Sequence, residues 1–168
     1  GMRSVELGAK SGTYTEYLLT PEAEEGDISI LNHDIRELRD DGTHLWVGSK
    51  LGVTIIDFET SVSTDHDLPQ GHDLHDMVLL DDHLVMMTES GTWIAGRDAG
   101  ELDDISLWQY FPGRYTAGTQ LISDGGDDYV LGLGHGGFGS VFQINSVSIS
   151  EFSIGTGISN AMNSGNAT

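Results

Sequence analysis

The sequence predicts an all-β protein assembled from repeated four-stranded antiparallel sheets. Three observations support this prediction: many glycines placed between short apolar runs, strand-sized β-branched segments, and a motif that returns about every 40 residues. The 168 residues include 23 glycines and only 3 prolines, and this glycine content is about twice the average. Such a composition is typical of strands joined by many tight turns.

The recurring motif is an eight-residue segment that begins with an apolar residue and ends with glycine. "LWVGSKLG" shows it most clearly, and the four copies begin at Val5, Leu45, Leu84 and Tyr129. Their eighth positions hold Gly12, Gly52, Gly91 and Gly136. The fourth position holds Gly8, Gly48, Met87 and Gly132. Because the glycines recur in register, the chain contains an internal repeat.

Further strand candidates flank every copy of the motif. β-branched and aromatic runs follow the copies at 13–19, 53–58, 92–97 and 138–144. Each motif and its following run are expected to form a hairpin whose turn glycine adopts a positive φ. First strands are expected at 34–38, 75–80 and 119–123, and polar outer strands at 61–68, 104–111 and 146–153. The unit is therefore four short strands in about 40 residues.

This period and strand number are typical of a blade of a β-propeller. We expect one propeller-like domain over 1–168, with blade units at 4–32, 33–72, 73–117 and 118–168. A β-sandwich also contains short strands and turns, but it gives no reason for glycines to repeat in register. The propeller is the favoured fold.

The segment "DIRELRDDGTHLWVGSKLGVTIIDFET" (34–60) resembles the two-component-regulator propeller repeat. Asp41-Gly42, the run 45–49 and Gly52 fall on the signature positions of that repeat, and 151–162 resembles its inter-blade segment. The resemblance extends over most of the chain. It implies a propeller and a sensory or interaction setting, and it suggests an extracytoplasmic location in sensor kinases, but it implies no reaction.

The two chain ends are expected to share one blade. The first motif lacks a preceding first strand, whereas 157–168 reads as an inter-blade turn followed by a spare first strand. One chain could close as a four-bladed ring, or two chains could close head to tail as an eight-bladed homodimer. We favour the dimer slightly; a fragment of a longer propeller is the third alternative.

Charge and composition exclude several classes of partner. The formal net charge is −20, from 27 acidic and 7 basic residues, which disfavours nucleic acid and anionic membrane surfaces. No cysteine is present, so disulfides and thiolate metal sites are excluded. The apolar runs are much shorter than the ~20 residues of a membrane span, so membrane insertion is not expected. No cofactor is expected.

The densest polar segment is "TDHDLPQGHDLHDM" (64–77). Its imidazoles and carboxylates could bind zinc, nickel or manganese through His66, His72, His75 and Asp76. On a strand, however, His72 and His75 would point to opposite faces. A solvated loop whose aspartates form turn hydrogen bonds is the alternative.

A second candidate is a contact surface for an unknown ligand or protein. Trp108, Tyr110 and Arg114 form an aromatic–arginine group of the kind enriched at interfaces. His72 and His75 could face the axial funnel, and His135 lies in the glycine-rich stretch 132–139. That stretch lacks the lysine and helix of a phosphate loop. A buried outer-strand edge is the competing explanation for the aromatic group.

Two functions follow from these patterns. The favoured one is a non-catalytic propeller that binds a ligand or protein or serves in assembly. The alternative is a metal- or histidine-dependent lyase or hydrolase acting at the propeller funnel, for which the sequence identifies no catalytic residues.

Overall fold

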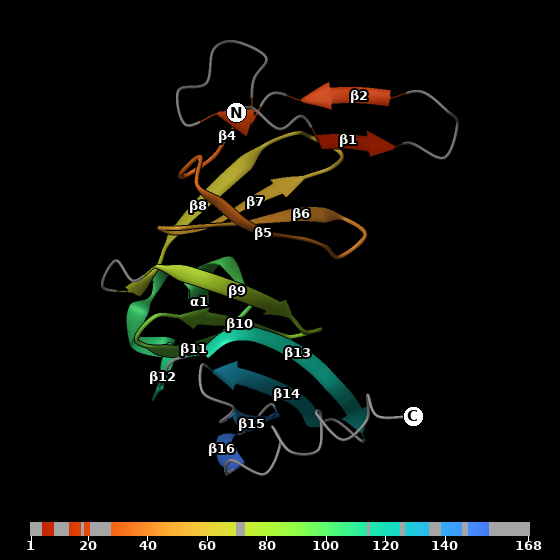
Figure 1. Cartoon of the computed structure of the whole chain (residues 1–168). Coiled ribbons are helices and arrows are strands. Elements are labelled where there is room, and N and C mark those ends of the chain that lie inside the picture. Colours follow the sequence, from red (N-terminus) through yellow and green to blue (C-terminus); the bar gives the residue numbers. More distant parts are fainter. Residues whose placement is uncertain are drawn as a thin grey trace, which may run out of the picture. The chain divides into compact units, whose positions relative to one another are not determined.

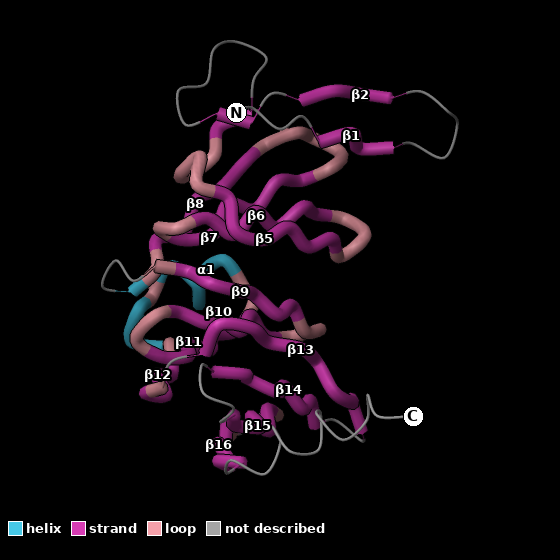
Figure 2. The backbone as a smooth tube through the Cα atoms, in the orientation of Figure 1, coloured by secondary structure: helices cyan, strands magenta, loops and turns pink. Residues whose placement is uncertain are grey.

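The computed structural model describes residues 5–8, 14–17, 19–20, 28–69, 73–113, 115–124, 127–134, 139–145 and 148–154. These residues form an all-β structure with three four-stranded sheets (Figures 1 and 2). The chain divides into two compact units, 1–71 and 72–168. The all-β prediction is confirmed.

The first unit contains one four-stranded sheet and two short strand pairs. The sheet has the order β5-β6-β7-β8, and all of its neighbouring strands are antiparallel. β1 pairs antiparallel with β2, and β3 pairs parallel with β4. The strands are β1 (Val5–Gly8), β2 (Tyr14–Tyr17), β3 (Leu19–Thr20), β4 (Ile28–Ser29), β5 (Ile35–Asp40), β6 (His44–Ser49), β7 (Gly52–Asp57) and β8 (Ser63–Asp67).

The second unit contains two four-stranded antiparallel sheets, of order β9-β10-β11-β12 and β13-β14-β15-β16. In each of them, consecutive strands are neighbours, as in a meander. The elements are β9 (Leu74–Leu79), β10 (His83–Thr88), β11 (Gly91–Gly96), α1 (Ala99–Asp103), the 3-10 helix η2 (Ile105–Leu107), β12 (Gln109–Pro112), β13 (Tyr115–Asp124), β14 (Asp127–Gly134), β15 (Gly139–Ile144) and β16 (Ile149–Ile154).

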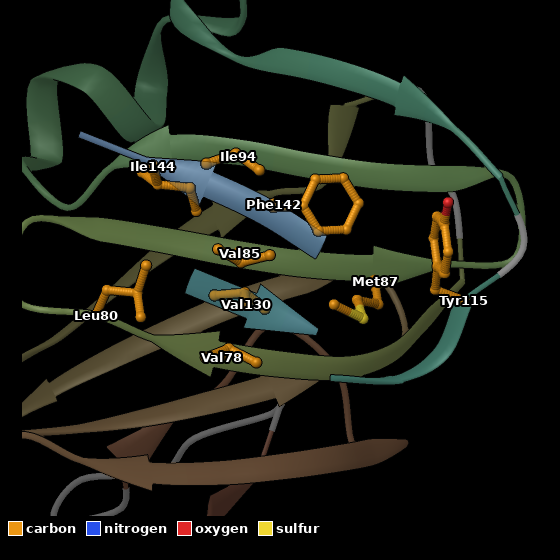
Figure 3. Close-up of a cluster of buried hydrophobic side chains, with 9 residues drawn as sticks. All are labelled: Val78, Leu80, Val85, Met87, Ile94, Tyr115, Val130, Phe142 and Ile144. Carbon is orange, nitrogen blue, oxygen red and sulfur yellow. The ribbon is translucent and has the colours of Figure 1, made fainter. Parts of the chain in front are cut away.

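The two sheets of the second unit pack face to face around one apolar core. Val85 of β10 and Ile94 of β11 belong to the same buried cluster as Val130 of β14 and Phe142 of β15. Figure 3 shows these side chains gathered between the strands, with Met87 and Tyr115 at one end of the cluster. Since each sheet is too thin to bury a face alone, this pairing supplies the core of the unit.

In the first unit, the core lies on one face of the β5–β8 sheet. Leu45 and Val47 of β6 and Ile56 of β7 are buried there together with Ile28 and Ile30. The alternate residue Trp46 is also buried, with 3% of its surface exposed. The sheet therefore carries buried apolar side chains on both faces.

The repeated glycine at the eighth motif position has a different role from the one expected. Gly52 and Gly91 are the first residues of β7 and β11, and neither has the positive φ found at Gly42 (91°). A Cβ on Gly52 would lie 2.2 Å from the carbonyl oxygen of His66 on the adjacent strand. A Cβ on Gly91 would lie 2.3 Å from the ring of Tyr110. Glycine is needed here because neighbouring strands approach closely.

The fifth motif position explains how the hairpin closes. The Ser49 hydroxyl donates to the carbonyl oxygen of Gly52 at 3.2 Å, and the Thr88 hydroxyl donates to that of Gly91 at 2.8 Å. Both hydroxyl residues are buried. The same hydrogen bond therefore secures the same turn in two repeats, which accounts for a hydroxyl residue at this position.

Met87 occupies a position that is glycine in the other three motifs, and the neighbouring sheet accommodates its larger side chain. A Cβ added to Gly118 of β13 would lie 2.5 Å from Met87 Cε and 2.8 Å from its sulfur. Gly118 is paired with Gly132 across β13 and β14. Met87 thus extends into space that Gly118 leaves open.

The β13–β16 sheet presents to the core the face opposite to the one that the motif alignment predicts. Val85 and Val130 hold the same motif position, yet both lie in the core between the two sheets of this unit. In a regular repeat, residues at the same motif position point toward the same neighbour in every sheet. If Val85 points toward the next sheet, Val130 would then point away from the β9–β12 sheet, and Leu131 would lie in this core instead. Because side chains alternate with a period of two, an offset of one residue exchanges the two faces of a strand.

The outer strand expected at 104–111 is shorter in the structure. Only Gln109–Pro112 forms β12, and helical turns occupy the preceding stretch. Asp98 accepts a hydrogen bond from the Gly100 amide and Asp104 accepts one from the Ser106 amide, at 2.9 and 3.0 Å. These two aspartates begin α1 and η2, which is the usual capping role of the residue.

Candidate functional site

The residues proposed as metal ligands lie in different surroundings. His66 of β8 is buried, with 2% of its surface exposed. His75 of β9 is exposed, and its neighbour Asp76 is partly buried. His72 lies outside the described residues. Within the part of the chain that the structure describes, no three His, Asp or Glu side chains are grouped to hold a metal ion. The metal site stays a prediction.

Asp76 connects the two sheets of the second unit. Its Oδ1 accepts a hydrogen bond from the Met77 amide at 2.8 Å, and its Oδ2 accepts one from the Gly118 amide at 2.6 Å. β9 and β13 therefore lie side by side where this carboxylate bridges them. Both carboxylate oxygens of Asp76 accept hydrogen bonds from backbone amides, so the first role of this residue is structural.

The aromatic group divides into a buried and an exposed member. The Trp108 side chain is 7% exposed, and its indole N–H donates to the Leu102 carbonyl at 3.1 Å. Tyr110 is 43% exposed, lies 4.5 Å from the Trp93 ring by centroid, and donates its hydroxyl to the Ser90 carbonyl. Arg114 lies outside the described residues, as does His135. Of the predicted contact residues, Tyr110 and His75 are those that the structure places at the surface.

A buried polar network was not predicted from the sequence. The Tyr115 hydroxyl lies 2.7 Å from Ser140 Oγ and donates to Glu151 Oε1 at 2.7 Å, and Ser140 Oγ donates to the same oxygen at 2.6 Å. Burial raises the pKa of Tyr115, with a smaller contribution from Glu151 in the same direction, while the Ser140 hydrogen bond opposes the rise. The phenol is therefore a neutral donor at physiological pH.

This network ties β13, β15 and β16 together at one end of their sheet. Tyr115 and Ser140 are 4% and 2% exposed, so a substrate would have no direct access to either hydroxyl. The sequence offered no signal for it, because Tyr115, Ser140 and Glu151 are far apart in the chain and belong to no motif. Its geometry is that of a satisfied buried polar cluster.

A second polar cluster surrounds Asp41, which lies between β5 and β6. The carboxylate accepts hydrogen bonds from the Thr43 and His44 amides at 2.9 and 2.7 Å and from the Trp46 indole N–H at 2.9 Å. Burial acts to raise the pKa of Asp41, but the hydrogen bonds from Trp46, Thr43 and His44 outweigh it and hold the pKa well below its usual range. Asp41 thus orders the β5–β6 turn and orients the buried Trp46 side chain.

No helix in the described part of the chain is long and apolar enough to cross a membrane.

Comparisons with known proteins leave the family of the chain open. No family model matches the sequence. No curated protein matches it either.

Solved structures show likeness at low sequence identity. PorZ, described as an essential bacterial surface component of the type-IX secretion system of Porphyromonas gingivalis, is 19% identical with a TM-score of 0.54. The likeness covers 86% of this chain but only 18% of PorZ. The likeness to the S. cerevisiae core factor, at 9% identity and a TM-score of 0.49, covers 92% of this chain and 27% of the core factor chain. The likeness to a structure of S. cerevisiae Dbp5 bound to Nup159, Gle1, IP6 and ADP, at 10% identity and a TM-score of 0.43, covers 71% of this chain and 36% of the matched chain.

The likeness to PorZ concerns the fold alone. This chain is similar to a small part of a larger protein, and the β-rich arrangement is what the two have in common.

Proposed function

We propose that this chain is a non-catalytic β-propeller module that binds a ligand or a protein partner, similar to the propellers of two-component sensors. The observation that carries the proposal is the packing of two successive four-stranded meanders, β9–β12 and β13–β16, around a shared core. In a propeller, neighbouring blades pack face to face and their first strands lie nearest the axis.

The first strands of the two sheets support this assignment. β9 and β13 are the first strands of their meanders, and the Asp76 carboxylate joins them through the Gly118 amide at 2.6 Å. The same two strands lie next to each other in the second unit (Figure 1). In a β-sandwich made of two meanders, no such tie between first strands is required.

Ring closure is part of the proposal in three forms. A single chain would form a four-bladed ring, two chains an eight-bladed ring, and a fragment would contribute blades to a longer propeller. We propose the second form, and an extracytoplasmic setting follows from the resemblance to sensor propellers. The surface residues His75 and Tyr110 are the described candidates for partner contacts, and Arg114, His72 and His135 complete the proposed set.

The alternative function is a metal- or histidine-dependent lyase or hydrolase. It is favoured by the exposed position of His75 on β9, the strand that the proposal places nearest the axis. A catalytic imidazole at the funnel needs such access to substrate.

A thermal-unfolding experiment separates the two functions. The wild-type chain and His75→Ala are unfolded with and without zinc, nickel and manganese, and each is assayed against ester and lactone substrates. The binding module predicts no metal-dependent turnover and an unfolding temperature that changes little with metal. Stabilisation by one metal that is lost in His75→Ala, together with turnover, would replace the proposal with the enzyme, because a ligand that binds only the folded state raises its stability.

The architecture has its own test in small-angle X-ray scattering. A propeller predicts a compact disc-like particle, and a scattering profile of two independently moving parts would contradict it. This measurement does not depend on the identity of any ligand.

A further inference from the structure

The turn between β5 and β6 contains a dipeptide that is chemically labile in unfolded chains. The sequence has two Asp-Gly pairs, Asp41-Gly42 and Asp124-Gly125. In such a pair the glycine nitrogen can attack the aspartate Cγ, because glycine has no side chain to hinder the approach. A C–N bond forms and closes a succinimide ring, while the carboxyl OH and the amide proton leave as water. Water then cleaves the ring at Cγ to restore aspartate, or at the main-chain carbonyl to give isoaspartate.

The native turn binds both oxygens of the Asp41 carboxylate. Oδ1 accepts hydrogen bonds from the Thr43 and His44 amides at 2.9 and 2.7 Å and from the Thr43 hydroxyl at 2.8 Å. Oδ2 accepts one from the Trp46 indole N–H at 2.9 Å. Ring closure removes one of the two oxygens, so at least one of these sets of hydrogen bonds is lost. Trp46 is 3% exposed, and water cannot easily replace the carboxylate there.

Charge opposes the reaction at both reacting groups. Burial acts to raise the pKa of Asp41, but the hydrogen bonds from Trp46, Thr43 and His44 outweigh it and hold the pKa well below its usual range. The carboxyl group is therefore ionised in the native turn and has no OH that can leave as water. The Gly42 amide donates to Asp40 Oδ1 at 2.6 Å. A carboxylate beside this N–H opposes the loss of the proton, and that loss is what makes the nitrogen nucleophilic.

We propose that Asp41-Gly42 is a latent isomerisation site, which the native β5–β6 turn protects and which reacts when the turn opens. The modification needs only water and no ligand, so it is independent of how the proposed propeller closes. When opening and closing are fast relative to the chemistry, the rate follows the fraction of chains in which the turn is open. The isoaspartate content of a sample therefore records how often the first unit opens.

Isomerisation would make the opening irreversible. In isoaspartate the main chain runs through the former side-chain atoms Cβ and Cγ, so the turn gains one main-chain carbon and the carboxylate moves to Cα. The acceptor then lies out of register with the Thr43 and His44 amides and with the Trp46 indole. A chain modified at position 41 should lose the stability that this carboxylate provides, because its donors are left without the acceptor.

Peptide mapping of the whole chain measures the rate at Asp41. Folded protein and protein unfolded in urea are incubated at neutral pH and the same temperature and then digested. Isoaspartyl and aspartyl peptides have equal mass, but chromatography separates them and electron-transfer fragmentation locates the site. In urea the two Asp-Gly pairs should react at similar rates. In folded protein the rate at Asp41 should be at least about tenfold lower than in urea.

Two substitutions test whether the hydrogen bonds cause the protection. Trp46→Phe removes the donor to Oδ2 and should raise the rate in folded protein about tenfold, which corresponds to the loss of a hydrogen bond to a charged group. Thr43→Ala removes the hydroxyl donor to Oδ1 at an exposed position and should raise the rate by a smaller factor. Trp93→Phe is the matched control, because Trp93 is also buried but lies in the second unit. It should leave the rate at Asp41 unchanged.

Two results would overturn the inference. Equal rates at Asp41 in folded and urea-unfolded wild type would show that the turn gives no protection. Unchanged rates in Thr43→Ala and in a folded Trp46→Phe would show that the protection does not come from these hydrogen bonds. Far-UV circular dichroism verifies folding, and Thr43→Ala decides the question alone if Trp46→Phe does not fold.

Discussion

Removal of the Asp41 carboxylate should destabilise the first unit strongly, because this side chain is largely buried and accepts several hydrogen bonds. Asp41→Ala deletes the acceptor of the Trp46 indole N–H and of the Thr43 and His44 amides. Trp46 is 3% exposed, so water cannot easily replace the lost acceptor. A hydrogen bond to a charged group contributes about 1.5–3 kcal/mol, and the two turn amides, which water can reach, add roughly 0.5 kcal/mol each. We expect a loss of about 2.5–4 kcal/mol in the free energy of unfolding.

The measurement is urea unfolding followed by far-UV circular dichroism. Asp40→Ala is the matched control, because Asp40 is exposed and accepts from the Gly42 amide at 2.6 Å. It should cost less than about 1 kcal/mol. A double-mutant cycle with Trp46→Phe isolates the indole contribution, and the Asp41→Ala cost should fall by about 1–3 kcal/mol in that background. Equal costs for Asp40→Ala and Asp41→Ala, or no coupling to Trp46, would refute the reasoning.

Three further predictions follow from the structure. Because the hydrogen bonds hold the pKa of Asp41 below its unfolded value, the ionised carboxylate stabilises the fold above about pH 4, and this stabilisation is lost as the pH falls further. The difference in free energy of unfolding between wild type and Asp41→Asn should therefore shrink below about pH 4 in urea titrations. A difference that grows there would contradict the lowered pKa. Gly52→Ala should cost roughly 1–3 kcal/mol by overpacking, since its Cβ would meet a backbone oxygen at 2.2 Å; Gly100→Ala in α1 should instead be neutral or stabilising by up to about 1 kcal/mol, and equal losses at both sites in thermal unfolding would remove the close-approach explanation. Gly118→Ala should lower the unfolding temperature, and the shorter side chain of Met87→Ala should reduce that effect because Met87 Cε and sulfur lie 2.5 and 2.8 Å from the added Cβ; strictly additive losses would show that the two residues do not share that space.

The pattern of the sequence was sufficient to locate nearly every described strand. In the motifs at 45–52 and 84–91, short runs of consecutive apolar residues and terminal glycines mark hairpins that the structure forms as β6–β7 and β10–β11. The local sequence pattern predicts such elements because the residues that a strand buries are apolar. The outer strand at 104–111 was predicted less well, since helix-capping aspartates compete with a strand there.

The candidate sites were less predictable. His75 and Tyr110 are at the surface, whereas Trp108 is buried with its indole N–H bonded to the Leu102 carbonyl. The composition of an aromatic group does not reveal which member packs inward, because that depends on a partner residue elsewhere in the chain. The proposed functions and the metal ligands stay predictions.

By itself the sequence determined the all-β class, the four-strand unit and the turn positions, since these depend on neighbours within a few residues. Only the tertiary structure decided which face of a strand enters the core. Val130 rather than Leu131 enters the core of the second unit, and Tyr115 of β13 joins Ser140 and Glu151 of the paired strands β15 and β16. The physical reason is the two-residue period of a strand: a shift of one residue leaves the local pattern unchanged but exchanges the buried and exposed faces, so contacts between sheets must select the register.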